Sequence, residues 1–188
     1  MEIKVSVKVL LTVCLFLTIF GCATQQADQS IIEPEPFSAV ITDSQWDGEH
    51  LPAGQQCHRF GGKNAAAPTM TVAGIPAQAN VILIEYSDRT FKLADNGGHG
   101  RIGYRITPGT AKLDLPPIPA HTFELPPGFF LVSPHRATKW DTAGAYLPPC
   151  SGGRGNSYYI IVKAVIQEDP DIKRFEVLAR TTVDLAVY

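Results

Sequence analysis

The sequence predicts a mainly β domain built from two packed sheets, with long ordered loops and little helix. Two observations carry this prediction. The segments Asn80–Tyr86 (NVILIEY) and Tyr158–Ile166 (YYIIVKAVI) are short apolar runs rich in β-branched and aromatic residues, which is typical of strands buried on both faces. The 16 glycines and 15 prolines fall between the apolar runs, where turns are expected.

The first 22 residues are typical of an export signal that ends in a lipidated cysteine. Lys4 and Lys8 precede an uncharged apolar run, Val9–Phe20, which has the length of a signal-peptide core and is shorter than a membrane-spanning helix. Ile19–Cys22 (IFGC) resembles the bacterial lipobox. We therefore expect cleavage after residue 21 and acylation of Cys22 with diacylglycerol and palmitate. The alternative is an ordinary signal peptide with a fortuitous cysteine.

The lipid anchor predicts a location in the bacterial cell envelope. Ala23, rather than Asp, follows the cysteine, and by resemblance to lipoprotein sorting this favours the outer membrane, facing the periplasm. Residues 22–36 are expected to form a flexible tether: Ala23–Ser30 is polar, and Ile31–Pro36 carries two prolines that favour extended backbone. The folded domain is predicted to span residues 37–188.

Further along the chain the pattern is one of strands and turns. Phe37–Trp46 is predicted to be extended, with a turn at Asp47-Gly48. Lys112–Gly128 contains five prolines and is expected to be a long irregular connection or an edge segment. Ile172–Arg180 is the single candidate for a short helix.

The charge balance argues against nucleic acid as a partner. The formal net charge is −2, and loss of the signal segment removes two lysines and one glutamate, which makes the mature chain more negative by one. Clusters of Lys and Arg interleaved with aromatic residues are absent from the sequence. The membrane contact expected is therefore the lipid on Cys22, not electrostatic docking.

Cysteine use agrees with an extracytoplasmic location. Cys14 leaves with the signal and Cys22 is acylated, so Cys57 and Cys150 remain as an even pair in an oxidising compartment. A disulfide between them would close a loop of about 93 residues and contribute roughly 4 to 5 kcal/mol on loop-entropy grounds. The alternative is two independent buried thiols. Two cysteines without a histidine at ligand spacing make a poor zinc site, and we predict neither a metal nor a cofactor.

Four segments, read in order, carry a family resemblance. Phe37–Cys57 holds a G-x-x-[IL]-P turn before a cysteine, and Pro68–Asp88 holds G-x-P-A before a buried strand. Leu125–Gly128 reads LPPG, and Gly144–Val165 reads GAYLPPCSGGRGNSYYIIVKAV. Together with a closing strand up to Tyr188, they resemble the phosphatidylethanolamine-binding protein (PEBP) family, in its bacterial Raf-kinase-inhibitor-like branch. The resemblance covers residues 37–188 and implies a large central antiparallel sheet packed on a smaller sheet.

The resemblance also implies a pocket for phosphate-like anions, and the sequence departs from the family there. The family pocket uses the aspartate of D-P-D, a histidine before an aromatic residue, and the histidine of G-x-H-R-Y. Aligned without gaps, Asp88 takes the first position, while Arg89 and Thr90 replace the proline and second aspartate. Ser157-Tyr158-Tyr159 occupies H-R-Y, so Ser157 replaces the histidine. The middle histidine has no clean equivalent, although His99 lies nearby in sequence.

Two glycine-rich loops supply the remaining candidates. Ser151–Asn156 (SGGRGN) offers backbone N–H groups and the donors of Arg154 to an anion; alternatively it is only a turn held by Cys150. His99 lies between glycines, where it could act as a donor, a pH-sensitive binder or a general base, or remain an ordinary loop histidine. The predicted ligand-binding set is Asp88, His99, Arg154, Asn156, Ser157 and Tyr159, with Arg101 and Tyr86 as lower-ranked lining residues.

The sequence thus favours a membrane-tethered extracytoplasmic binding protein for a small anionic or phospho-headgroup ligand. A first alternative is a protein-interaction or inhibitor module with a non-functional pocket. A second is a hydrolase with Ser157, His99 and Asp88 as nucleophile, base and orienting acid. The sequence lacks the G-x-S-x-G elbow, H-E-x-x-H, a phosphate-binding P-loop and a dinucleotide fingerprint, so we predict no enzymatic activity.

Overall fold

A computed structural model describes residues 35–188, which form ten strands and two short 3₁₀ helices. The predicted signal segment, Cys22 and most of the predicted tether lie outside the described residues. Within the described part, no helix is long and apolar enough to cross a membrane. In chain order the elements are β1 (Ser38–Ile41), η1 (His58–Phe60), β2 (Ala66–Ala67), β3 (Met70–Ala73), β4 (Val81–Asp88), η2 (Lys92–Ala94), β5 (Arg101–Arg105), β6 (Lys112–Leu115), β7 (Ile118–Pro119), β8 (Phe129–Ser133), β9 (Ser157–Ile166) and β10 (Glu176–Val187).

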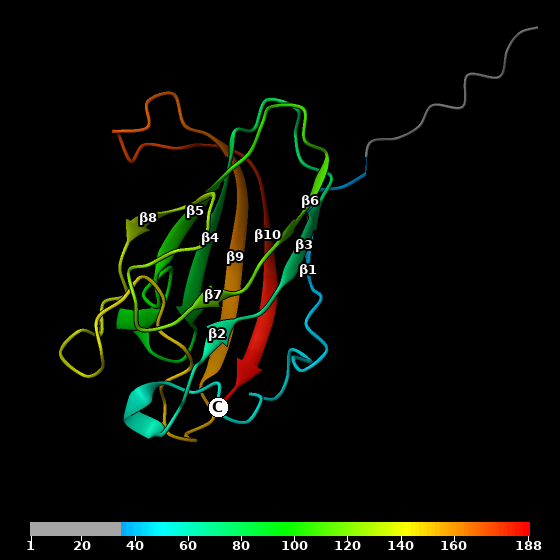
Figure 1. The fold of residues 1–188 in the computed structure, drawn as a ribbon. Coiled ribbons are helices and arrows are strands. Elements are labelled where there is room, and N and C mark those ends of the chain that lie inside the picture. Colours follow the sequence, from blue (N-terminus) through cyan, green and yellow to red (C-terminus); the bar gives the residue numbers. More distant parts are fainter. Residues whose placement is uncertain (1–34) are drawn as a thin grey trace, which may run out of the picture. The chain divides into compact units, whose positions relative to one another are not determined.

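A five-stranded antiparallel sheet with strand order β10-β9-β4-β5-β8 forms the centre of the fold (Figure 1). All eight residues of β4 are buried, and most of β9 is buried as well. The two strands predicted from apolar runs are therefore confirmed. Because β4 and β9 are central and covered on both faces, their residues can be apolar in sequence without alternation.

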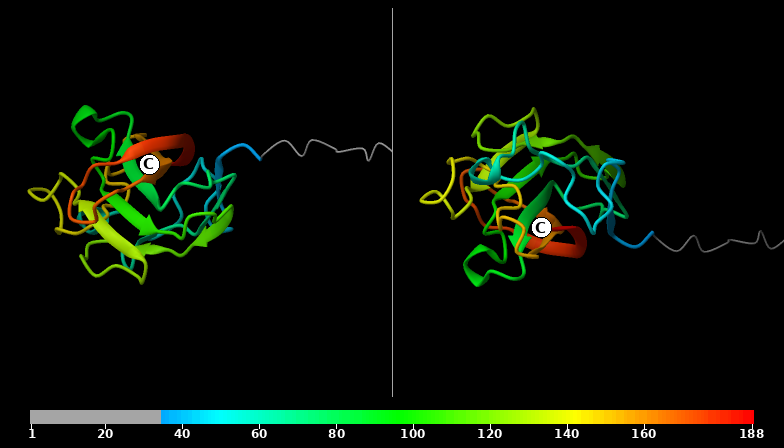
Figure 2. Two further views of the ribbon diagram at one scale, coloured as in Figure 1. Left: turned by 90° about the horizontal axis from the view of Figure 1, so that it is seen from above. Right: turned by 90° about the horizontal axis from the view of Figure 1, so that it is seen from below.

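A smaller sheet, with order β1-β3-β6, covers one face of the central sheet, and β2 pairs with β7 beside it. The end-on views of Figure 2 show these layers. The main core lies between them and joins Met70 and Val72 of β3 to Ile82 and Ile84 of β4 and to Ile160 of β9. Alternate residues of the same central strands face the other side, where a second apolar cluster forms from Val81, Leu83, Val132 and Val165. The predicted architecture of a large sheet packed on a smaller one is confirmed.

Three segment predictions are refined by the structure. Phe37–Trp46 is a strand only over β1, since the Asp43 carboxylate accepts a hydrogen bond from the Gln45 N–H (3.0 Å) and turns the chain. Lys112–Gly128 includes β6, an edge strand of the smaller sheet. The short helix suggested for Ile172–Arg180 was wrong: β10 begins at Glu176 and pairs along all of β9. Pairing with a buried neighbour overrides the weak local preference for helix.

The predicted disulfide between Cys57 and Cys150 is present, with 5.2 Å between the Cα atoms. It joins the residue before η1 to the loop before β9. The Cys57 N–H also donates to the carbonyl of Pro149 (3.0 Å), so the two segments are joined twice. The disulfide therefore closes a long loop that contains β2 to β8.

Replacing both cysteines, Cys57→Ser with Cys150→Ser, is expected to lower the free energy of unfolding by about 2 to 5 kcal/mol. The physical reason is the entropy that the unfolded chain regains when a loop spanning 93 positions is opened. Urea unfolding followed by circular dichroism measures the difference against the oxidised wild type. An unchanged unfolding midpoint and slope would contradict this expectation.

Candidate ligand-binding site

A cavity of about 710 Å³ lies on the core face of the central sheet, at the end of β4 and the start of β9. Its wall is mixed in character, with an apolar side, a cationic side and a few polar groups between them. The apolar side is formed by Phe60, Phe91, Leu93, Ala94, Ala137, Trp140, Leu147 and Tyr158. The cationic side is formed by Arg59, Arg136 and Arg154, and the polar groups include Asp88, Thr90, His99, Ser151 and Asn156.

Asp88 lies at the last position of β4, opposite Tyr158 in the register of β4 and β9. Directly opposed residues share a face of the sheet, so both side chains reach the cavity. The carboxylate of Asp88 is 2% exposed and is fully engaged. Its Oδ1 accepts hydrogen bonds from the N–H groups of Thr90 (2.8 Å) and Phe91 (3.1 Å), and its Oδ2 accepts from Nδ2 of Asn156 (2.7 Å). Asp88 thereby positions Asn156.

His99 enters the cavity from the start of β5. Its N–H donates to the carbonyl of Tyr86 (3.0 Å), and its ring Nδ1 lies 2.8 Å from the carbonyl oxygen of Leu147. Because a carbonyl only accepts, Nδ1 carries the proton in the neutral ring and Nε2 is left as an acceptor. Burial lowers the pKa of His99, and the Leu147 carbonyl only partly opposes this shift. His99 therefore presents a neutral imidazole to the cavity.

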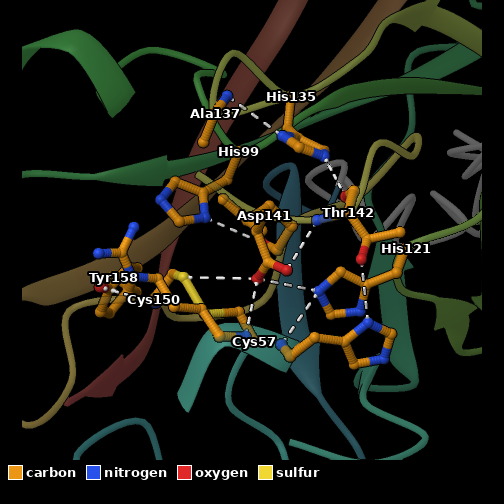
Figure 3. A network of polar contacts seen from close by, with 12 residues as sticks. Cys57, His99, His121, His135, Ala137, Asp141, Thr142, Cys150 and Tyr158 are labelled. Carbon is orange, nitrogen blue, oxygen red and sulfur yellow. Dashed lines mark hydrogen bonds and ion pairs between the residues drawn. A yellow bond between two sulfur atoms is a disulfide. The ribbon is translucent and has the colours of Figure 1, made fainter. Parts of the chain in front are cut away.

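Tyr158 connects the cavity to the disulfide. Its hydroxyl accepts a hydrogen bond from the N–H of Cys150 (3.0 Å), and its ring meets the edge of the His99 ring, with 5.3 Å between centroids (Figure 3). Burial raises the pKa of the Tyr158 phenol to about 12, so the hydroxyl stays protonated at neutral pH. It is therefore a fixed, uncharged wall of the cavity.

The glycine-rich loop has the backbone that its composition predicts. Gly152, Gly153 and Gly155 have φ of 69°, 77° and 79°, a region that residues with a side chain rarely adopt. The loop carries Arg154, whose Nη1 donates to the carbonyl of Ser151. Arg136 approaches from the other side and donates to the carbonyls of Asp95 and Asn96 (both 3.3 Å). Both arginines are exposed residues, and both line the cavity.

Four of the six predicted ligand-binding residues, Asp88, His99, Arg154 and Asn156, line this cavity. Ser157 and Tyr159 do not, because side chains alternate along β9 and Tyr158 takes the cavity face. On the opposite face Ser157 Oγ accepts from Nη1 of Arg89 (3.0 Å), and the Tyr159 hydroxyl bonds the Asp95 carboxylate. Asn156, not Ser157, lines the cavity beside Tyr158.

The two lower-ranked candidates also lie elsewhere. Arg101 pairs with the buried carboxylate of Glu85 (2.9 Å), which Lys163 also contacts (2.8 Å). Tyr86 packs against Tyr146 in the core, with 4.5 Å between ring centroids. Neither residue lines the cavity. Four cavity residues were not predicted from the sequence: Arg59, Arg136, Phe91 and Trp140. They lie in or beside loops that contain no motif, so the sequence shows only that cationic and aromatic residues occur there.

The two-layer β fold thus carries a cavity whose lining includes the exposed residues Arg59, Arg136 and Arg154. The crystal structure of Escherichia coli YbcL, described as a new member of the mammalian PEBP family, is similar to the chain, with a TM-score of 0.56 and 17% identity. The similarity covers 82% of this chain and 98% of YbcL. A putative PEBP homologue from Chlamydia trachomatis, CT736, matches with a TM-score of 0.47 and 12% identity over 81% of this chain and 97% of that one.

At these identities, the likeness to YbcL shows the fold: the chain has a PEBP-like fold. No family described from sequence and no curated protein matches the chain. The resemblance inferred from four short segments is thus confirmed at the level of the fold.

Acidification is expected to destabilise the protein partly through His99. Its pKa lies below 6.5 in the folded protein, so the unfolded chain takes up a proton that the folded protein does not, and stability is lost as the pH falls below 6.5. Urea unfolding from about pH 7 to about pH 5 should show this loss, with a shallower slope for His99→Gln. Burial lowers the pKa values of His121 and His135 as well, so only the difference between the two proteins reports on His99. If stability fell equally steeply with pH in the two proteins, the lowered pKa of His99 would be contradicted.

Proposed function

We propose that the protein is an extracytoplasmic binding protein, tethered to the bacterial membrane through Cys22, that holds a small anionic or phospho-headgroup ligand without catalysis. The observation that carries the proposal is the convergence of three exposed arginines and a glycine-rich loop on one cavity. The disulfide between Cys57 and Cys150 supports an oxidising compartment, because such bonds are rare in the cytosol.

The charges at the cavity favour an anion. Arg59, Arg136 and Arg154 outnumber the single lining carboxylate, Asp88, whose oxygens are occupied by three hydrogen-bond donors. A guanidinium group presents paired N–H donors that match phosphate and carboxylate geometry. Asn156 holds only one amide hydrogen toward Asp88 and retains donor and acceptor capacity for a ligand.

The apolar side of the cavity supports a ligand that also carries an apolar part. Phe91 and Trp140 pack against each other at the mouth, with 5.7 Å between ring centroids. Leu93 is 64% exposed and Trp140 51% exposed beside them. Phosphatidylethanolamine, after which the PEBP family of the similar structure YbcL is named, combines a phosphorylated headgroup with apolar chains and has this chemistry.

The two alternative functions receive less support. An interaction module with a non-functional pocket predicts a cavity filled by Tyr158, Tyr159 or the glycine-rich loops, whereas the cavity is open at about 710 Å³. A hydrolase built on Ser157 needs that hydroxyl beside His99. Instead, Ser157 lies on the face of β9 opposite the cavity and accepts from Arg89.

Binding of phosphoethanolamine, measured by isothermal titration calorimetry, tests the proposal. We expect Arg154→Ala to weaken the affinity roughly tenfold or more, since a hydrogen bond to a charged group is worth about 1.5 to 3 kcal/mol. Arg180→Ala is the matched control: it removes the same charge from an exposed position of β10 that does not line the cavity. Equal effects of the two substitutions, or no binding by the wild type at millimolar ligand, would reject the proposal.

Tryptophan fluorescence tests the apolar side of the cavity. The sequence contains two tryptophans, and Trp46 is buried in the core while Trp140 lines the cavity mouth. A short-chain phosphatidylethanolamine should shift the emission of Trp140 to shorter wavelength, because the ring becomes covered by apolar chains. The shift should vanish in Trp140→Phe and persist in Trp46→Phe. A shift that persists without Trp140 would place the apolar contact elsewhere.

A further inference from the structure

A second group of side chains, separate from the lining of the cavity, brings two histidines and an aspartate together. Figure 3 shows two of its members, His121 and Asp141. His58 belongs to η1, His121 follows β7, and Asp141 lies in the loop after β8. One ring nitrogen of each histidine and a carboxylate oxygen of Asp141 all lie within 4.8 Å of one another. None of these residues belongs to the candidate set that the sequence suggested.

The Asp141 carboxylate is held by neighbouring backbone. Its Oδ1 accepts from the N–H of Thr142 (2.7 Å), and its Oδ2 lies 3.4 Å from Nε2 of His121. The side chains of His121 and Asp141 are each only 3% exposed. A metal-binding carboxylate is normally oriented by such outer hydrogen bonds, which keep an oxygen directed at the ion.

His121 is held in an unusual conformation. Its φ is 57°, a left-handed value that is uncommon for a residue other than glycine. Its N–H donates to the carbonyl of Tyr146 (3.2 Å), and the adjoining pair, Ala145 N–H to Thr122 carbonyl, is 2.8 Å. A side chain on Gly144 would collide with the backbone of Thr122, at 2.6 Å. The surrounding chain thus enforces a conformation that local preference disfavours, which is common at functional sites.

His58 completes the group from the solvent side. Its ring stacks on the ring of His121, with 3.7 Å between centroids and 13° between planes. The preceding residue, Cys57, is fixed by the disulfide, and the exposed His58 ring lies with its Nδ1 3.3 Å from Oγ1 of Thr142. One ligand therefore comes from an exposed residue, and two come from a buried pair.

We propose that His58, His121 and Asp141 form a binding site for a divalent transition metal of the zinc class. Two imidazoles and one carboxylate are a ligand set that zinc accepts, with water at the fourth position. Zinc–nitrogen and zinc–oxygen bonds of about 2.0 to 2.2 Å place tetrahedral ligand atoms roughly 3.4 Å apart. The 3.4 Å between His121 Nε2 and Asp141 Oδ2 already has this value. A metal there would replace the contact of the His58 N–H with His121 Nε2 (3.4 Å), and the His58 ring would have to turn from its contact with Thr142 to offer a nitrogen.

The proposed metal would join two segments that also form the wall of the ligand cavity. Arg59 and Trp140, which line the cavity, are the direct chain neighbours of His58 and Asp141. The proposed metal site therefore lies next to residues of the cavity wall, and a bound metal would hold these two segments together. The two sulfurs near Asp141 belong to the disulfide, with Cys150 Sγ 3.6 Å from Oδ2, and in the oxidised protein they are not thiolate ligands.

Calorimetric titration of Zn²⁺ into the oxidised, untagged, chelator-treated protein tests the proposal. We expect one zinc ion per chain, and at least a tenfold weaker affinity for His58→Ala, His121→Ala and Asp141→Asn. Ca²⁺, which prefers oxygen ligands, should not compete. His50→Ala is the matched control, because His50 and Asp47 form an exposed histidine–aspartate pair (2.9 Å) elsewhere.

A substitution at the exposed His58 tests metal binding without removing a buried side chain. His121→Ala and Asp141→Asn each remove a buried side chain, so a loss of metal binding in these variants could also result from unfolding. His58→Ala changes an exposed residue and should keep the wild-type melting temperature without metal. Zinc should raise the melting temperature of the wild type and of His50→Ala, but not that of His58→Ala. The proposal is overturned if zinc does not bind, or if His58→Ala binds it as tightly as the wild type does. In that case His121 and Asp141 are an ordinary buried polar pair.

Discussion

The pairing of β4 with β9 is the constraint on which the rest of the structure depends. Both strands are central in the five-stranded sheet and covered on both faces, so a shift of register by one residue would exchange every buried side chain between the two layers. The observed register sets Asp88 opposite Tyr158 at the end of the core face. In the same register Ser157 and Tyr159 lie on the other face, where they form hydrogen bonds with Arg89 and Asp95. The composition of the cavity follows from this register.

The scaffold could be predicted from the sequence because apolar runs and an even number of cysteines in the exported part are strong signals. The β4 and β9 strands and the Cys57–Cys150 disulfide were predicted correctly, as was the PEBP-like fold. At the site, the same reasoning placed Asp88 and Asn156 in one pocket but misassigned Ser157. The glycine-rich stretch before β9 offers no fixed register, and only strand alternation decides which of three consecutive residues faces inward.

The remaining residues were beyond prediction because they meet only through the tertiary fold. Trp140 and Arg136 lie in the loop after β8, which contains proline, charge and aromatic residues without a recognisable pattern. The His58, His121 and Asp141 group draws on three separate loops, and the spacing matches no known metal motif. The left-handed backbone of His121 depends on contacts with residues 144–146 rather than on its own sequence. The conformation of a loop that is held by distant contacts cannot be predicted from a local sequence pattern.

The disulfide stands between the cavity and the histidine group. On one side, the N–H of Cys150 donates to the Tyr158 hydroxyl in the cavity wall. On the other, Cys150 Sγ lies 3.6 Å from the Asp141 carboxylate. A metal on Asp141 that also restricted the exposed side chain of Trp140, its chain neighbour, would remove part of the entropy that a cavity ligand otherwise loses when Trp140 is immobilised. Because such coupling is reciprocal, a ligand that packs on Trp140 would strengthen metal binding by the same factor. The two proposed sites would then act as one thermodynamic unit, with the disulfide as their shared rigid support.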